Sequence, residues 1–141
     1  MLDRRQLMTR VIGAMVAGLA VSRDPVAQAT ATPLTDRLSL ISSGGTNVLA
    51  LSIPDGLVLV DSGTLDGSDA LVAELRSLPG GGVRTVFNTH YHPENTGANE
   101  MLRQSGATIV AHENTRLWMA TPVWNPAQDR YRPPRPTPAQ P

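Results

Sequence analysis

The most informative stretch of the sequence spans residues 88–97 and reads Asn88-Thr89-His90-Tyr91-His92-Pro93-Glu94-Asn95-Thr96-Gly97. His90 and His92 are two of the three histidines in the chain. In an extended segment, residues i and i+2 project to the same side of the backbone, about 7 Å apart. Two imidazoles placed in this way can bind one metal ion, each at about 2.0–2.1 Å. Because Glu94 adds a carboxylate two residues later, the pattern predicts a metal site at His90, His92 and Glu94.

The flanking segments predict that these histidines lie at the end of a strand. Residues 85–88 form a short β-branched run, and the apolar residues Ala98, Met101 and Leu102 indicate a helix after the histidines. Open α/β sheets bind ligands at the carboxyl ends of their strands. Two simpler interpretations stay open: the histidines only form hydrogen bonds in a surface loop, or Asn95 only caps the following helix.

The periodicity of the whole chain predicts a mixed sheet with helices packed on it, an α/β (α+β) fold. Apolar runs between turn residues predict strands at 38–42, 47–53, 57–60, 85–88 and 108–111. Helical spacing predicts helices at 68–78, around 98–102 and at 114–119. The runs at 47–53 and 57–60 barely alternate, which favours strands covered on both faces. His112 lies at a strand-to-helix junction and is interpreted as a capping or packing histidine.

Both ends of the chain differ from this central part. Residues 1–29 carry Arg4-Arg5, then an uncharged run at 11–21 that is too short to span a bilayer, then a small-x-small pattern at 27–29. This segment resembles a twin-arginine export signal, and an ordinary secretory signal is the alternative. The resemblance implies a periplasmic or secreted protein without a membrane anchor after cleavage. Residues 121–141 hold seven of the twelve prolines and predict a tail or linker, with a proline-motif ligand as the less favoured interpretation.

Composition excludes several classes of protein. Twelve basic and twelve acidic residues give no net charge, and aromatic residues make up 4% of the chain. A nucleic-acid-binding protein would show a basic excess, so no nucleic-acid partner is expected. The chain has no cysteine, which excludes disulfides and cysteine-ligated metal sites.

Residues 88–97 resemble the metal-binding segment Thr-His-x-His-x-Asp-His-x-Gly of the metallo-β-lactamase fold superfamily. Thr89, His90, His92 and Gly97 match this segment. Residues 57–63 (Leu-Val-Leu-Val-Asp-Ser-Gly) resemble the opening hairpin of that fold, and residues 106–116 resemble the strand and helix that follow the motif. The resemblance implies the N-terminal half of an αββα sandwich, with residues 30–120 as a partial domain.

The same resemblance implies a role for each site residue. His90 and His92 would bind the first metal ion, and Glu94 would stand where the family has an aspartate that binds a second metal and holds the attacking water. Asn95 stands where the family has a further histidine. Asp61 would orient the ligands from behind, or it would be only a turn carboxylate at a strand end. Because Glu is longer than Asp and an amide is a weaker ligand than imidazole, we expect one zinc ion or an altered pair, with another divalent metal as an alternative.

The expected function is that of an exported metal-dependent hydrolase in which metal-activated water attacks an ester, amide or lactam carbonyl of a small-molecule substrate. The family fold needs about 200 residues and further ligands downstream, so we expect the chain to be an N-terminal fragment. The alternative is a catalytically inactive remnant that binds metal weakly or serves as an interaction module. A cupin-type site is excluded because Glu94 follows the histidines too closely. Half a sandwich would also leave one sheet face uncovered and the chain poorly soluble.

Overall fold

The computed structural model describes residues 28–134. The strands are β1 (Ala29–Pro33), β2 (Leu38–Ser43), β3 (Thr46–Ile53), β4 (Gly56–Val60), β5 (Val83–Asn88), β6 (Thr108–Ala111), β7 (Val123–Asn125) and β8 (Arg130–Arg132). The helices are α2 (Ser68–Leu75), α3 (Pro93–Thr96), α4 (Asn99–Gln104) and α5 (Glu113–Ala120). The predicted signal at 1–29 lies outside the described residues up to residue 27, and Ala29 already belongs to β1. Within the described range no helix is long and apolar enough to cross a membrane.

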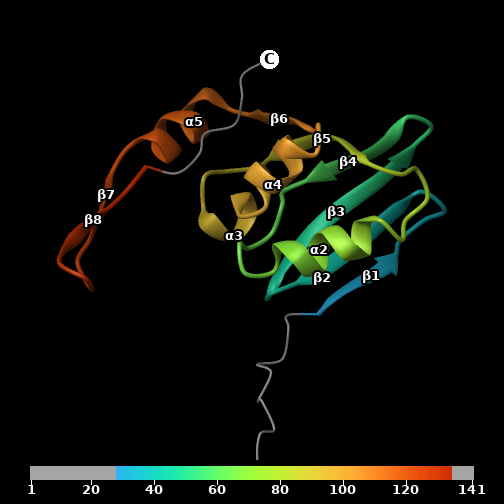
Figure 1. Cartoon of the computed structure of the whole chain (residues 1–141), viewed down its shortest axis with the longest axis horizontal. Coiled ribbons are helices and arrows are strands. Elements are labelled where there is room, and N and C mark those ends of the chain that lie inside the picture. Colours follow the sequence, from blue (N-terminus) through green and yellow to red (C-terminus); the bar gives the residue numbers. More distant parts are fainter. Residues whose placement is uncertain (1–27, 135–141) are drawn as a thin grey trace, which may run out of the picture.

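The described strands β1 to β6 form one mixed sheet in sequence order. The pairs β1–β2, β2–β3 and β3–β4 are antiparallel and follow one another through short turns. The pairs β4–β5 and β5–β6 are parallel, so each needs a crossover, which α2 supplies for the first and α3 with α4 for the second. Figure 1 shows these three helices on one side of the sheet. This arrangement confirms the predicted mixed α/β fold.

The core lies between this sheet and its helices. Its sheet side is a set of fully buried side chains on neighbouring strands, namely Ile41, Val48, Ala50, Leu57, Leu59, Val86 and Ile109. Ala50 pairs with Leu59, and Val86 pairs with both Leu59 and Ile109, so these side chains share one face. The helices contribute Leu71, Leu75, Ala98 and Leu102 to the same cluster. Burying each large side chain stabilises the fold by about 1.5–3 kcal/mol. This packed layer therefore fixes the end of β5, from which the histidine segment continues.

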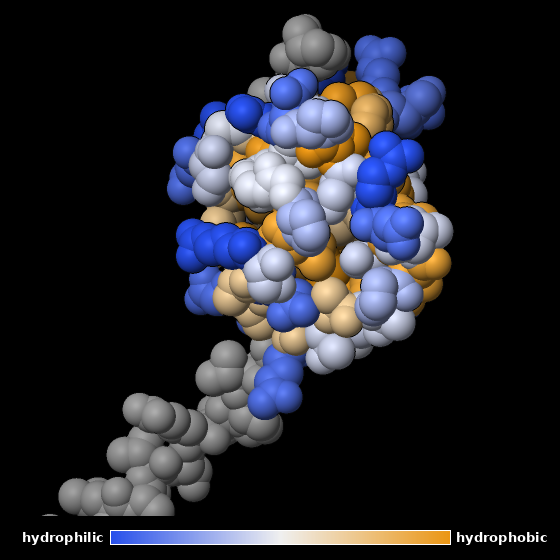
Figure 2. Space-filling view, turned by 90° about the vertical axis from the view of Figure 1, so that its right-hand side faces the viewer, coloured by the Kyte–Doolittle hydropathy of each residue, from blue (hydrophilic) through white to orange (hydrophobic). Residues whose placement is uncertain are grey.

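The opposite sheet face is apolar and only partly covered. Leu49, Val60, Phe87 and Val110 are consecutive cross-strand partners on that face. Val60 is 36% exposed and Phe87 is 46% exposed. Another side of the molecule, the right-hand side of Figure 1, also shows hydrophobic surface between hydrophilic side chains (Figure 2). Among the described residues, helices cover only one face of the sheet. The prediction that strands 47–53 and 57–60 are covered on both faces is therefore wrong for this part of the chain.

The structure differs from the prediction in three places. Strand β1 was not expected, because its Ala-Thr-Ala-Thr-Pro sequence has little apolar character, yet Ala31 N–H donates to Glu74 of α2 at 3.0 Å. The helix expected around 98–102 is α4, and the separate turn α3 precedes it. Residues 123–132, within the predicted tail, contain the hairpin β7–β8, which lies with α5 beside the sheet (Figure 1). Residues 135–141 of that tail lie outside the described residues.

Candidate metal centre

The histidine segment occupies the loop between β5 and α3. His92 is the residue before the first turn of α3 and has an extended backbone, φ −62° and ψ 145°. Pro93 then starts α3, where its missing N–H costs no hydrogen bond and its fixed φ suits a helix. An extended His90–His92 segment followed by a fixed helix start is the local geometry that directs residues i and i+2 to one side.

The two imidazoles converge. His90 Nε2 lies 3.0 Å from His92 Nδ1, and the rings meet edge to face with their centroids 4.7 Å apart. The Glu94 carboxylate lies beside them, with Oε1 3.6 Å from His92 Nδ1, and the side chains of His92 and Glu94 are about half exposed. The structure therefore brings the three residues of the predicted ligand set together at the carboxyl end of β5.

Asp61 lies behind His90 and reaches it through Thr89. Asp61 follows β4 and is 8% exposed. It adopts a left-handed backbone with φ +64°. Its carboxylate accepts hydrogen bonds from Thr89 N–H at 2.8 Å and from Thr89 Oγ1 at 2.8–3.0 Å. Since the Thr89 hydroxyl proton points to Asp61, its oxygen can only accept from His90 Nδ1–H, 2.8 Å away. This chain of bonds places the proton of His90 on Nδ1 and the lone pair on Nε2, the nitrogen that faces His92 Nδ1 and the Asn95 amide.

Asn95 lies within α3, not at its cap, so the capping interpretation of Asn95 is wrong. Its side-chain amide nitrogen lies 3.0 Å from His90 Nε2. Its backbone oxygen accepts from Ser62 N–H at 2.9 Å and from the Asn88 amide at 3.2 Å. Asn95 thus contacts the histidine pair with its side chain and fixes the loop with its main chain.

A buried polar network under the loop was not singled out from the sequence. Asn99 accepts from Ser62 Oγ at 2.8 Å and donates to Asn88 Oδ1 at 2.7 Å. Ser62, Asn88 and Asn99 are at most 7% exposed. The network ties the ends of β4 and β5 to the first residue of α4. Its sequence signal is weak, because Ser62 and Asn99 are 37 residues apart.

Gly97 allows the loops after β4 and α3 to touch. Its N–H donates to Gly63 C=O at 2.8 Å. A Cβ at this position would overlap the backbone of Thr64 and Leu65. A glycine is therefore required here by close approach of two main chains, although its φ of −65° is ordinary.

The third histidine is separate from this group. His112 precedes α5, and its Nδ1 accepts from Asn114 N–H at 3.1 Å. This confirms the interpretation of His112 as a capping residue.

The donor set fits part of a zinc site. Two nitrogens bound to one tetrahedral zinc at about 2.0–2.1 Å lie about 3.3 Å apart. The 3.0 Å between the two imidazole nitrogens is close to that separation. Across residues 28–134, however, no group of three or more His, Cys, Asp or Glu side chains has an arrangement that could hold a metal ion. The described residues thus offer an imidazole pair with a flanking carboxylate.

The fold and the site together define a class of protein. It has a mixed sheet with helices packed on one face, and a His-x-His pair at the carboxyl end of the parallel strand β5. The family model described as the metallo-beta-lactamase superfamily matches residues 42–140. The chain belongs to this superfamily. No curated protein matches the chain.

Solved structures agree with this assignment. The metallo-beta-lactamase SMB-1 in complex with mercaptoacetic acid is 24% identical, with a TM-score of 0.64 over 83% of this chain. A metallo-beta-lactamase from Pontibacter korlensis is 24% identical, with a TM-score of 0.57 over 66% of this chain. The subclass B3 enzyme BJP-1 of Bradyrhizobium japonicum is 21% identical, with a TM-score of 0.60 over 69%. The chain covers 47%, 47% and 38% of these proteins, so it spans less than half their length. At these identities the likeness establishes the fold.

Proposed function

We propose that the chain is the N-terminal part of an exported metal-dependent hydrolase that attacks an ester, amide or lactam carbonyl of a small molecule. The observation that carries this proposal is the 3.0 Å approach of His90 Nε2 and His92 Nδ1 at the carboxyl end of β5. Superfamily membership of residues 42–140 supports it. The remaining ligands would come from the part of the fold that the matched structures have and this chain does not span.

The proposed roles follow from the contacts of each residue. His90 and His92 hold one zinc ion or another divalent metal, and Glu94 either completes the ligand set or positions and deprotonates the attacking water. Zinc, when bound, supplies a water of lowered pKa and polarises the substrate carbonyl. Asp61 keeps the His90 tautomer through Thr89, since the carboxylate takes the hydroxyl proton at 2.8 Å. The Asn95 amide, 3.0 Å from Nε2, holds the His90 ring in the metal-free chain and gives up this contact when a metal binds, because both use the same lone pair.

A second candidate is an inactive remnant that binds metal weakly or acts as an interaction module. The lack of a three-ligand group among residues 28–134 favours this candidate. A catalytic zinc site normally has three protein ligands and a water. With two imidazoles and a half-exposed carboxylate, zinc would bind weakly and the site would lack the walls that exclude solvent.

A hydrolysis assay tests the remnant candidate, which turnover at the histidine site would refute. The purified chain is loaded with zinc and tested on a chromogenic ester and a chromogenic β-lactam, beside the His90→Ala variant. His112→Ala is the matched control, because His112 only caps α5. Turnover that is lost in His90→Ala and kept in His112→Ala supports the hydrolase. Zinc binding without turnover shows that this chain alone is inactive, and it fits both candidates, because the proposed hydrolase takes its remaining ligands from the part of the fold that this chain does not span.

Export is a separate proposal that rests on residues 1–29. Arg4-Arg5 followed by the uncharged run at 11–21 supports a twin-arginine-like signal and a periplasmic or secreted mature protein. Cell fractionation of the Arg4→Lys, Arg5→Lys double variant tests it, with Arg10→Lys as the control. Retention of the double variant in the cytoplasm is expected, and export equal to that of the control would refute the twin-arginine assignment.

A further inference from the structure

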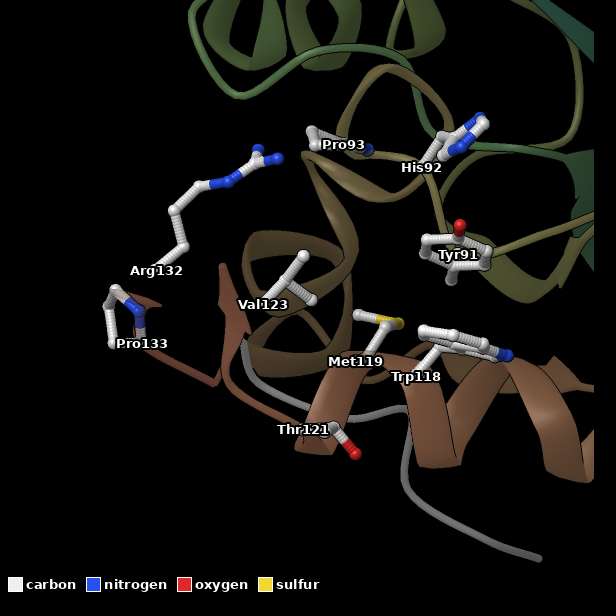
Figure 3. A pocket seen from close by; sticks show the side chains of 9 residues that line it. All are labelled: Tyr91, His92, Pro93, Trp118, Met119, Thr121, Val123, Arg132 and Pro133. Carbon is white, nitrogen blue, oxygen red and sulfur yellow. The ribbon is translucent and has the colours of Figure 1, made fainter. Parts of the chain in front are cut away.

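A cavity of about 150 Å³ lies beside the histidine loop. Tyr91, His92 and Pro93 form one wall, and α5 with the β7–β8 hairpin forms the other. Figure 3 shows Met119 and Val123 on this second wall, and Arg132 across the cavity from His92. An engineered cavity of similar volume in another protein admits benzene, so there is room for a ligand with one ring.

The floor of the cavity is apolar and its aromatic wall is held in place. Met119 is 2% exposed, so its side chain is fixed by packing. Tyr91 stacks on Trp118 with ring centroids 5.3 Å apart and 17° between the planes. Tyr91 also meets His92 edge to face at 4.7 Å. These ring contacts join α5 to the histidine loop, so the cavity has one rigid apolar side that suits the ring of a ligand.

The polar end of the cavity is cationic. Among residues 28–134, Arg132 is the only residue lining the cavity that has a permanent charge, and no acidic residue of this range lines it. Within the described part of the chain no carboxylate forms an ion pair with Arg132. A guanidinium binds a carboxylate with two parallel hydrogen bonds, which gives both affinity and orientation. The positive charge of Arg132 therefore favours an anionic ligand, and the apolar side of the cavity favours an anion that also carries a hydrophobic group.

We propose that this cavity binds a small carboxylate with a single aromatic ring, with the carboxylate on Arg132 and the ring over Met119 and Trp118. Binding needs no metal, because none of these three residues belongs to the proposed ligand set. His92 lines the same cavity.

The test is a binding titration with phenylacetate in the presence of EDTA, so that failure of the metal site cannot affect it. The chain has two tryptophans, and Trp124→Phe leaves Trp118 as the only one. Saturable change of Trp118 fluorescence by phenylacetate is expected. Phenylacetamide, which has the ring without the charge, and acetate, which has the charge without the ring, should each bind at least about tenfold more weakly. Ligand-observed NMR of phenylacetate provides a second readout.

The matched variants are Arg132→Gln and Arg130→Gln in this background. Both side chains are exposed on β8, but Arg130 bonds to Gln128 and does not line the cavity. Arg132→Gln should raise the Kd for phenylacetate at least about tenfold, and Arg130→Gln should leave it unchanged. Equal Kd values in the two variants, equal binding of phenylacetamide, or no saturable signal in either readout would overturn the proposal.

Discussion

Replacing Asn99 with alanine is expected to destabilise the protein strongly, although Asn99 touches neither histidine. Its side chain is 4% exposed and joins Ser62 to Asn88. Alanine would remove the donor that satisfies Asn88 Oδ1. Ser62 Oγ and the Asn88 amide nitrogen would still reach Asn95 C=O, at 3.3 Å and 3.2 Å. One buried acceptor is thus left without its partner.

The magnitude follows from this count of lost partners. An unsatisfied buried polar group costs about 1–3 kcal/mol. The missing amide also leaves a void that the packed loops fill only in part, so the free energy of unfolding should fall by about 2–4 kcal/mol in total. Gln104→Ala on the same helix is the matched control. Its amide bonds to Glu100 at the surface, so its change should stay within about 0.5 kcal/mol.

Urea unfolding followed by circular dichroism measures both variants, at low protein concentration so that the uncovered sheet face causes little association. The unfolding free energies are compared at equal m values. A loss below about 1 kcal/mol in Asn99→Ala, or a loss equal to that of Gln104→Ala, would refute the reasoning that this network holds the loop under the histidines.

Three further predictions concern the loop, the histidine and the sheet face. Gly97→Ala should lower the free energy of unfolding in urea by at least about 2 kcal/mol, because a Cβ there overlaps neighbouring backbone. Gly82→Ala, which has open space around it, should leave the free energy of unfolding nearly unchanged, and equal losses in the two variants would contradict this. Asp61→Asn should weaken zinc binding about 10- to 100-fold in a competition assay with a metal indicator, since it removes the carboxylate that fixes the His90 tautomer through Thr89; unchanged affinity would show that this link has no effect. Val60→Thr combined with Phe87→Thr should reduce self-association in light scattering, because both side chains are exposed on the uncovered face; unaltered association would locate the contact elsewhere.

The histidine site was predictable where it depends on local spacing. His90 and His92 converge because residues i and i+2 of an extended segment share a side, and Pro93 fixes where that segment ends. The strands of the central sheet followed from β-branched runs between turns. The role of His112 followed from its place before a helix.

The polar network was not predictable, because it depends on tertiary distance. Ser62 and Asn99 meet only when α4 packs beside β4, and neither residue has a local pattern that marks it. The β7–β8 hairpin was missed for another reason: its prolines outweighed the turn signal. Asn125 Oδ1 accepts from Ala127 N–H, and Trp124 packs against Tyr131 at 5.1 Å across the strands. An Asn-Pro turn between two aromatic residues was the signal available in the sequence.

The most direct test of the account is a zinc titration of the metal-free chain by isothermal calorimetry. The proposed centre predicts about one zinc ion per chain, held by the two imidazoles. Zinc binding should be lost in His90→Ala and in His92→Ala. It should be kept in His112→Ala, because His112 caps α5 and lies outside the proposed site. Zinc binding that persists undiminished in His90→Ala, or no binding by the unchanged chain, would contradict a metal centre at His90 and His92.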